Sequence, residues 1–186
     1  MRYTINSNNR IKSLIGFLLF YLLCKIMFST VALEVLLQNV PLEGKLIARI
    51  TAIFSLIFST FYSWLLIIAL FSSVWYASKL CFEKLPFNSL ILAFQTTTII
   101  FIATEFLKLG FVWLFLLDEI PLIDLTSSSL ISQIENTNYH KFSHIADNFS
   151  IGATCLFFYI ELDQKVVTKL AISCIFMLAY LIITLI

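Results

Sequence analysis

Long apolar stretches alternate with short polar ones along the chain, and this pattern predicts membrane-spanning helices. A helix needs roughly 20 apolar residues to cross a hydrocarbon core about 30 Å thick. The stretches that qualify are residues 14–33, 50–78, 87–117, 146–162 and 166–186. The expected fold class is therefore all-α, with residues 1–186 forming one polytopic transmembrane helical bundle of about five spanning helices. The fourth stretch is the shortest and needs a locally thin bilayer or residues that precede it.

The first stretch has two interpretations. Basic residues, an apolar run and the letters STVA before Leu33 resemble a cleaved secretory signal peptide. The run is longer than the apolar region of a typical signal, and it contains Lys25. Both features favour a retained helix.

Residues 118–148 form the largest segment between the predicted spans. Apolar side chains recur there at roughly helical spacing, at Leu130, Ile134, Phe142 and Ile145, and Asn138 interrupts the stripe. This spacing predicts an amphipathic helix lying on the outer leaflet.

The distribution of basic residues predicts the orientation of the bundle. With five spans and a cytoplasmic N-terminus, seven basic residues fall on the cytoplasmic side and three on the outer side. The seven are Arg2, Arg10, Lys12, Lys79, Lys84, Lys165 and Lys169, and the three are Lys45, Arg49 and Lys141. We expect an integral protein of a bacterial inner membrane, with its N-terminus in the cytoplasm and its C-terminus outside.

Composition supports the membrane assignment and narrows the partners. Of the 186 residues, 60% are hydrophobic and 12% are charged, whereas soluble domains are about 45–50% apolar and about 25% charged. The net charge of +1 provides no basic surface for nucleic acid. The expected partners are the lipid bilayer and other membrane protein subunits, in a homo-oligomer or a hetero-oligomer.

Polar residues within the third span are the main functional clue. Gln95, Thr98, Glu105 and Lys108 fall on one half of a helix at 100° per residue. This half either lines a small binding cavity or packs against neighbouring helices. In the packing interpretation, threonine hydroxyls bond to carbonyls one turn back, Gln95 cross-links helices, and Glu105 pairs with Lys108.

Lys25 lies near the middle of the first span, where an unpaired charge is costly. Glu105 is the best partner for it within the membrane, provided that the third helix is tilted or extends as far as Asp118. The alternative partner is an acidic group on another chain, in which case Lys25 marks an interface between subunits.

Signatures of catalysis are missing from the sequence. It contains no GxSxG, no phosphate-binding loop and no Gly-rich dinucleotide turn. His140, His144 and Asp147 could share one helix face, as metal ligands do, but a solvated interfacial helix accounts for them better. We therefore expect no catalytic residues, no metal, no cofactor and no enzymatic activity.

The segment from Tyr62 to Ile99 resembles the Yip1 family of small multi-pass membrane proteins. In that family a long apolar helix ends in a short basic turn, and a Phe opens the next helix, as Phe87 would here. The family's Gly-rich turn between helices two and three, and its acidic-aromatic-Gly-Pro motif, are absent. The resemblance implies five helices and a non-catalytic protein that acts through partners, and it transfers no site residues.

Three functions follow from these observations, and the first is the one we expect. It is a non-catalytic integral membrane accessory or scaffold subunit, acting through protein partners in a membrane complex. The second is the substrate-binding membrane component of a small-molecule transporter. The third is a membrane enzyme that uses Glu105, or His140 with His144.

Overall fold

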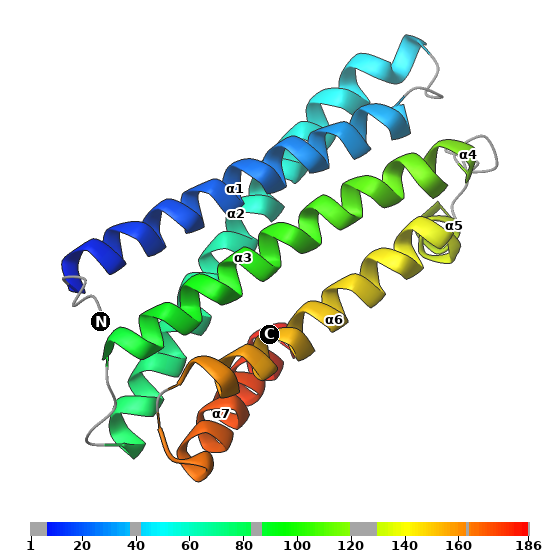
Figure 1. Cartoon of the computed structure of the whole chain (residues 1–186). Helices are drawn as coiled ribbons and strands as arrows, with labels where there is room; N and C mark the ends of the chain where they lie inside the picture. Colours follow the sequence, from blue (N-terminus) through cyan, green and yellow to red (C-terminus); the bar gives the residue numbers. More distant parts are fainter. Residues whose placement is uncertain (1–6, 38–41, 83–86, 120–129, 163, 186) are drawn as a thin grey trace. The chain divides into compact units, whose positions relative to one another are not determined.

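The computed structural model describes residues 7–37, 42–82, 87–119, 130–162 and 164–185, and these residues are almost entirely helical, with no strand among them (Figure 1). The helices are α1 (Ser7–Leu36), α2 (Leu42–Cys81), α3 (Phe87–Phe111), the π-helix η2 (Val112–Leu116), α4 (Leu117–Glu119), α5 (Leu130–Asn136), α6 (Asn138–Glu161) and α7 (Val166–Leu185). The all-α prediction is confirmed for the described residues.

Three helices are long and apolar enough to cross a membrane. They are Asn9–Leu36, Arg49–Cys81 and Phe87–Glu119, and they contain the predicted spans 14–33, 50–78 and 87–117. The third runs from α3 through η2 into α4 without interruption. These three helices are compatible with an integral membrane protein.

The fourth and fifth predicted spans correspond to α6 and α7. Helix α6 has 24 residues, which corresponds to about 36 Å at 1.5 Å per residue, but its first half is polar. In α7 the apolar part is shorter, Val166–Ile182. Neither helix combines the length and the hydropathy of the three long apolar helices. A total of five spans therefore stays a prediction.

The segment 118–148, which is predicted to lie on the membrane surface, differs in the structure from that prediction. Helix α6 continues unbroken from Asn138 to Glu161, so no helix boundary separates residues 118–148 from residues 146–162. A break does occur at Thr137, beside the Asn138 that interrupts the apolar stripe. Residues 120–129 of this segment lie outside the described part of the chain.

The described chain divides into two compact units. The first contains residues 1–21, 62–101 and 150–186, and the second contains residues 22–61 and 102–149. Helices α1, α2, α3 and α6 contribute residues to both units. The expectation of a single domain over residues 1–186 stays a prediction.

Aromatic rings join four helices within the first unit. Phe71 of α2 stacks on Phe94 of α3, with ring centroids 4.3 Å apart. Phe94 meets Phe158 of α6 at 5.7 Å, and Phe158 meets Phe176 of α7 at 5.0 Å. Phe158 and Phe176 are completely buried. Buried rings in such geometries contribute both apolar burial and specific orientation.

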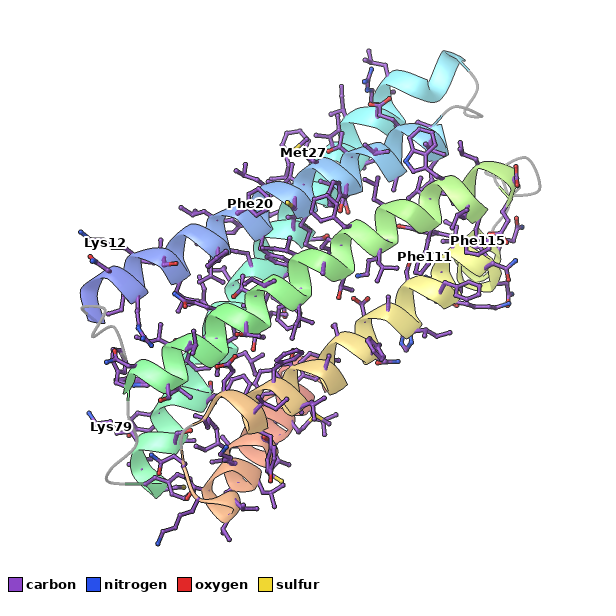
Figure 2. All side chains as sticks on the ribbon, viewed as in Figure 1. Lys12, Phe20, Met27, Lys79, Phe111 and Phe115 are labelled. Carbon is purple, nitrogen blue, oxygen red and sulfur yellow. The ribbon has the colours of Figure 1, made fainter. Side chains whose placement is uncertain are left out.

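A second aromatic group lies in the other unit, where it holds α6 against the end of α3. Phe142 of α6 stacks on Phe115 of η2 at 4.8 Å and meets Phe111 of α3 at 5.6 Å. Figure 2 labels Phe111 and Phe115 on this segment. Val35 of α1 packs with Val112 and Leu116 nearby. Three helices are thereby fixed side by side around the candidate site.

Candidate functional site

A partly enclosed cavity of about 260 Å³ lies in the second unit, between α1, α3 with η2, and α6. Its polar lining consists of Lys25, Ser29, Glu105, Lys108, Tyr139, His140, Ser143, His144 and Asp147. Phe28, Leu109 and Val112 complete the wall. The volume is far larger than a single water needs, about 10–15 Å³, and slightly below the range of small-molecule pockets, about 300–1,000 Å³.

Helical spacing explains why these residues converge. Residues three, four or seven apart share a helix face, which brings Glu105, Lys108 and Val112 together on α3 and η2. The same rule aligns His140, His144 and Asp147 along α6. Beside the charged groups, the ring of Phe28 meets Phe106 edge-on at 4.7 Å, which fixes α1 against α3.

Glu105 connects the charges of the cavity. Its Oε1 lies 3.9 Å from Nζ of Lys25 and 3.8 Å from Nζ of Lys108. Nζ of Lys108 also lies 2.5 Å from Oδ1 of Asp147. The Glu105 side chain is only 9% exposed, so water screens its two contacts poorly, whereas the Asp147 side chain is 50% exposed and its pair with Lys108 is screened more. Two cations and two anions therefore balance within one site.

The predicted pairs of Glu105 with Lys25 and with Lys108 are confirmed. The condition set for the first pair is also met, because the third helix continues to Glu119. At 1.5 Å per residue, Lys25 lies about 17 Å along its helix from Leu36, and Glu105 about 20 Å from Glu119. Both residues therefore lie well inside long apolar helices.

The ion pair between Lys108 and Asp147 was not predicted. The sequence analysis places Asp147 in the segment 118–148 on the outer leaflet and on one helix face with the two histidines. The available signal was the polar face of α6, on which Tyr139, Ser143 and Asp147 recur at intervals of four. This spacing shows that α6 has a polar side, but it does not show which helix packs against that side.

The start of α6 is held by two different residues. The Thr137 hydroxyl accepts a hydrogen bond from the backbone N–H of His140 at 3.1 Å, as an N-cap residue does. The Glu119 carboxylate accepts the backbone N–H groups of Asn138 and Tyr139, at 2.9 and 3.4 Å. A carboxylate at this end also complements the helix dipole.

A π-helix adjoins the cavity. Val112, a wall residue, is the first residue of η2. A π turn contains more residues than an α turn, so it changes the direction in which the side chains after it point around the helix axis. Here it is followed by Glu119, which reaches the start of α6. Such turns occur frequently at functional sites.

The other two predicted site residues, Gln95 and Thr98, belong to the first unit and do not line this cavity. The Gln95 amide donates to the carbonyl of Arg10 on α1 at 2.9 Å, which confirms the predicted cross-link between helices. Thr97 and Thr98 donate to carbonyls one turn back, at 2.8 and 2.9 Å. For this part of α3 the packing interpretation is the correct one.

His140, His144 and Asp147 all line the cavity, as their shared helix face suggests. Among the described residues, however, no three His, Cys, Asp or Glu side chains are placed to hold a metal ion. Nδ1 of His144 lies 3.0 Å from the amide nitrogen of Asn148, and Asp147 pairs with Lys108.

The sequence matches no protein-family model, no curated protein and no solved structure. The resemblance to the Yip1 family therefore stays an expectation from the sequence.

Proposed function

We propose that the chain is an integral membrane protein that binds a small polar solute in the cavity around Glu105, as the substrate-binding component of a small-molecule transporter. The observation that carries this proposal is the cavity's lining, with two lysines and two acids drawn from α1, α3 and α6. Ionisable groups within apolar helices mark functional sites by default, because they are costly to keep there.

The open volume beside the charges argues against a purely structural role for them. An ion pair that only joins helices is most stable when the surrounding space is filled, because an unfilled void forfeits packing contacts. Here about 260 Å³ remains open next to the pairs. A small solute with several polar groups would fill that space and meet the side chains that line it.

The accessory-subunit hypothesis had a different basis. It rests on buried charges without clear partners in the same chain and on the absence of catalytic motifs from the sequence. Lys25 and Lys108 both lie near acidic side chains of the same unit. The hypothesis stays a prediction from the sequence, and it is the one favoured if no solute binds.

The test is a ligand screen on the full chain in lipid nanodiscs. Thermal unfolding is recorded with polar solutes of each charge class, and a ligand at about 100 times its Kd is expected to stabilise the protein by about 2.7 kcal/mol. Replacing a wall residue, Ser143→Leu or Ser29→Leu, fills the cavity without removing a charge and is expected to abolish that stabilisation.

The matched control is Glu34→Gln, which removes an exposed ion pair with Arg49 elsewhere in the second unit. It is expected to leave the ligand-induced stabilisation unchanged. If no charge class stabilises the wild-type protein, the proposed function is wrong.

A further inference from the structure

The buried acid of the cavity, Glu105, has its charge balanced but its oxygens unsatisfied. Its Oε1 lies 3.9 Å from Nζ of Lys25 and 3.8 Å from Nζ of Lys108, whereas an N–H···O hydrogen bond spans about 2.7–3.2 Å. Among the described residues, no other donor reaches this carboxylate. Both lysines therefore neutralise Glu105 without donating a direct hydrogen bond to it.

A carboxylate in this position needs hydrogen-bond donors. Its two oxygens together offer about four acceptor positions, and a buried charge is stable when it is hydrogen-bonded as well as paired. The Glu105 side chain is 9% exposed, and it lines the open volume of about 260 Å³. A molecule that fills this volume therefore fits the site best when it donates hydrogen bonds to Glu105.

The second acid of the cavity, Asp147, is satisfied in a different way. Its Oδ1 lies 2.5 Å from Nζ of Lys108, which is a direct, charge-assisted contact. The Asp147 side chain is also 50% exposed, so solvent reaches it. Glu105 rather than Asp147 is therefore the acceptor that an enclosed ligand would meet.

The charges of the lining limit which molecules can supply these donors. Two lysines and two acids line the cavity, and with both histidines neutral their charges balance. A ligand with a net charge, whether an anion or an ammonium donor, would upset this balance among apolar helices. An uncharged donor leaves the balance intact.

The apolar part of the wall narrows the choice further. Phe28, Leu109 and Val112 line the cavity together with the charged groups. A polyol suits both parts, because its hydroxyls donate while its C–H groups cover apolar surface. Two adjacent hydroxyls also supply one donor for each oxygen of a carboxylate. Urea offers a similar pair of N–H donors, but it has no C–H surface for the apolar wall.

We propose that the cavity binds a small uncharged polyol, whose adjacent hydroxyls donate hydrogen bonds to the Glu105 carboxylate. This inference rests on the proposed function, since it names the solute class of the same site. Hydroxyl oxygens also accept hydrogen bonds, and solvent at the open side of the cavity meets that need. Binding involves no covalent step and no change in the charge of the site.

The experiment is isothermal titration calorimetry of the full chain in lipid nanodiscs, with four probes. Erythritol is the polyol, and 1,4-butanediol has the same carbon chain and end hydroxyls but no adjacent pair. Erythronate adds a negative charge to the same skeleton, and urea supplies paired donors without C–H surface. We expect erythritol to bind at least about tenfold more tightly than each of the others, since one hydrogen bond to a charged group corresponds to about a tenfold change in affinity or more.

Variants of the ion pairs test whether the carboxylate itself is the acceptor. Glu105→Gln alone leaves two lysines facing one acid, so weaker binding could follow from instability. The double variant Glu105→Gln/Lys25→Met restores the balance of charge. We expect it to unfold at a temperature close to that of the wild type and still to bind erythritol at least about tenfold more weakly. Glu34→Gln, which removes the exposed pair with Arg49, is the matched control and should bind as the wild type does.

The outcomes separate this inference from the proposed function. If 1,4-butanediol, erythronate or urea binds the wild-type protein as tightly as erythritol, the inference fails although a solute binds. It also fails if the double variant keeps the wild-type affinity for erythritol, or if polyols do not bind while another solute in the thermal screen does. The comparison of probes on the wild-type protein decides the matter even if the double variant does not fold. If nothing binds in either experiment, both proposals fall.

Discussion

At the scale of single residues, Glu105 determines how the charges of the second unit are organised. It lies within 4 Å of two lysines that come from different helices. Removing its charge would leave two ammonium groups sharing Asp147 as their remaining acidic partner in the lining. Part of the lost stability should be recovered when one of the two lysines is also replaced, because the remaining lysine and Asp147 then balance in charge.

We expect Glu105→Gln to destabilise the protein by about 2 kcal/mol. Breaking a fully buried pair costs about 3–5 kcal/mol, and the contacts of 3.8 and 3.9 Å and the 20% exposure of Lys25 reduce that figure. Adding Lys25→Met should recover most of the loss. Unfolding of the four proteins of this double-mutant cycle, in one lipid composition, gives the coupling.

The control for this cycle is again Glu34→Gln, whose pair with Arg49 is exposed. Surface pairs contribute about 0–1 kcal/mol. If Glu34→Gln and Glu105→Gln lowered the free energy of unfolding equally, Glu105 would contribute no more than a surface residue.

Much of the residue-level pattern could be read from the sequence. Polar side chains within an apolar helix must find partners, and three of the contacts follow from that requirement: Lys25 with Glu105, Glu105 with Lys108, and Gln95 with a neighbouring helix. Asp147 could not be assigned in this way. Its contact with Lys108 depends on how α6 is rotated against α3, and the packing of Phe142 on Phe111 and Phe115 sets that rotation.

At the scale of helices, α6 shows where a hydropathy pattern and a helix boundary differ. The sequence separates a polar surface segment from an apolar span, because solvent preference changes near residue 146. A helix, however, ends where its backbone hydrogen bonds are broken or capped. No proline lies between Asn138 and Glu161, so one helix covers both segments. The sequence predicts one amphipathic helix with Asn138 interrupting its apolar stripe, whereas the structure has two helices, α5 and α6, separated at the neighbouring Thr137.

The capping carboxylate of Glu119 gives a prediction at this scale. Glu119→Gln should destabilise the first turn of α6 by about 1 kcal/mol, since it weakens two hydrogen bonds and removes a charge that complements the helix dipole. Hydrogen exchange at the amides of Asn138 and Tyr139 measures the change. Glu135→Gln, an exposed substitution on α5, should leave that exchange unaltered.

At the scale of the whole molecule, the number of membrane crossings decides where the two ends lie. Three helices are long and apolar enough to cross, and the sequence predicts that α6 and α7 cross as well. Length and composition make the first three compatible with crossing. The other two depend on how lipid and neighbouring helices accommodate the polar half of α6, and the sequence pattern does not determine that.

We expect reporter fusions to place the two ends on opposite sides of the membrane. A C-terminal alkaline phosphatase should be active outside, and an N-terminal fluorescent protein should fold in the cytoplasm. A truncation after Glu119, with the reporter attached there, should also report outside. Activity at Glu119 but not at the C-terminus would mean that only one of α6 and α7 crosses.

The pairing of Lys25 with Glu105 bears on how the protein is made. Because synthesis proceeds from the N-terminus, the lysine leaves the ribosome well before its counterion has been translated. If α1 enters the bilayer in order, Lys25 is there without its Glu105 counterion until α3 follows. The insertion machinery would then have to retain α1 near the translocon, and a chain that stalls before residue 105 should be recognised and degraded.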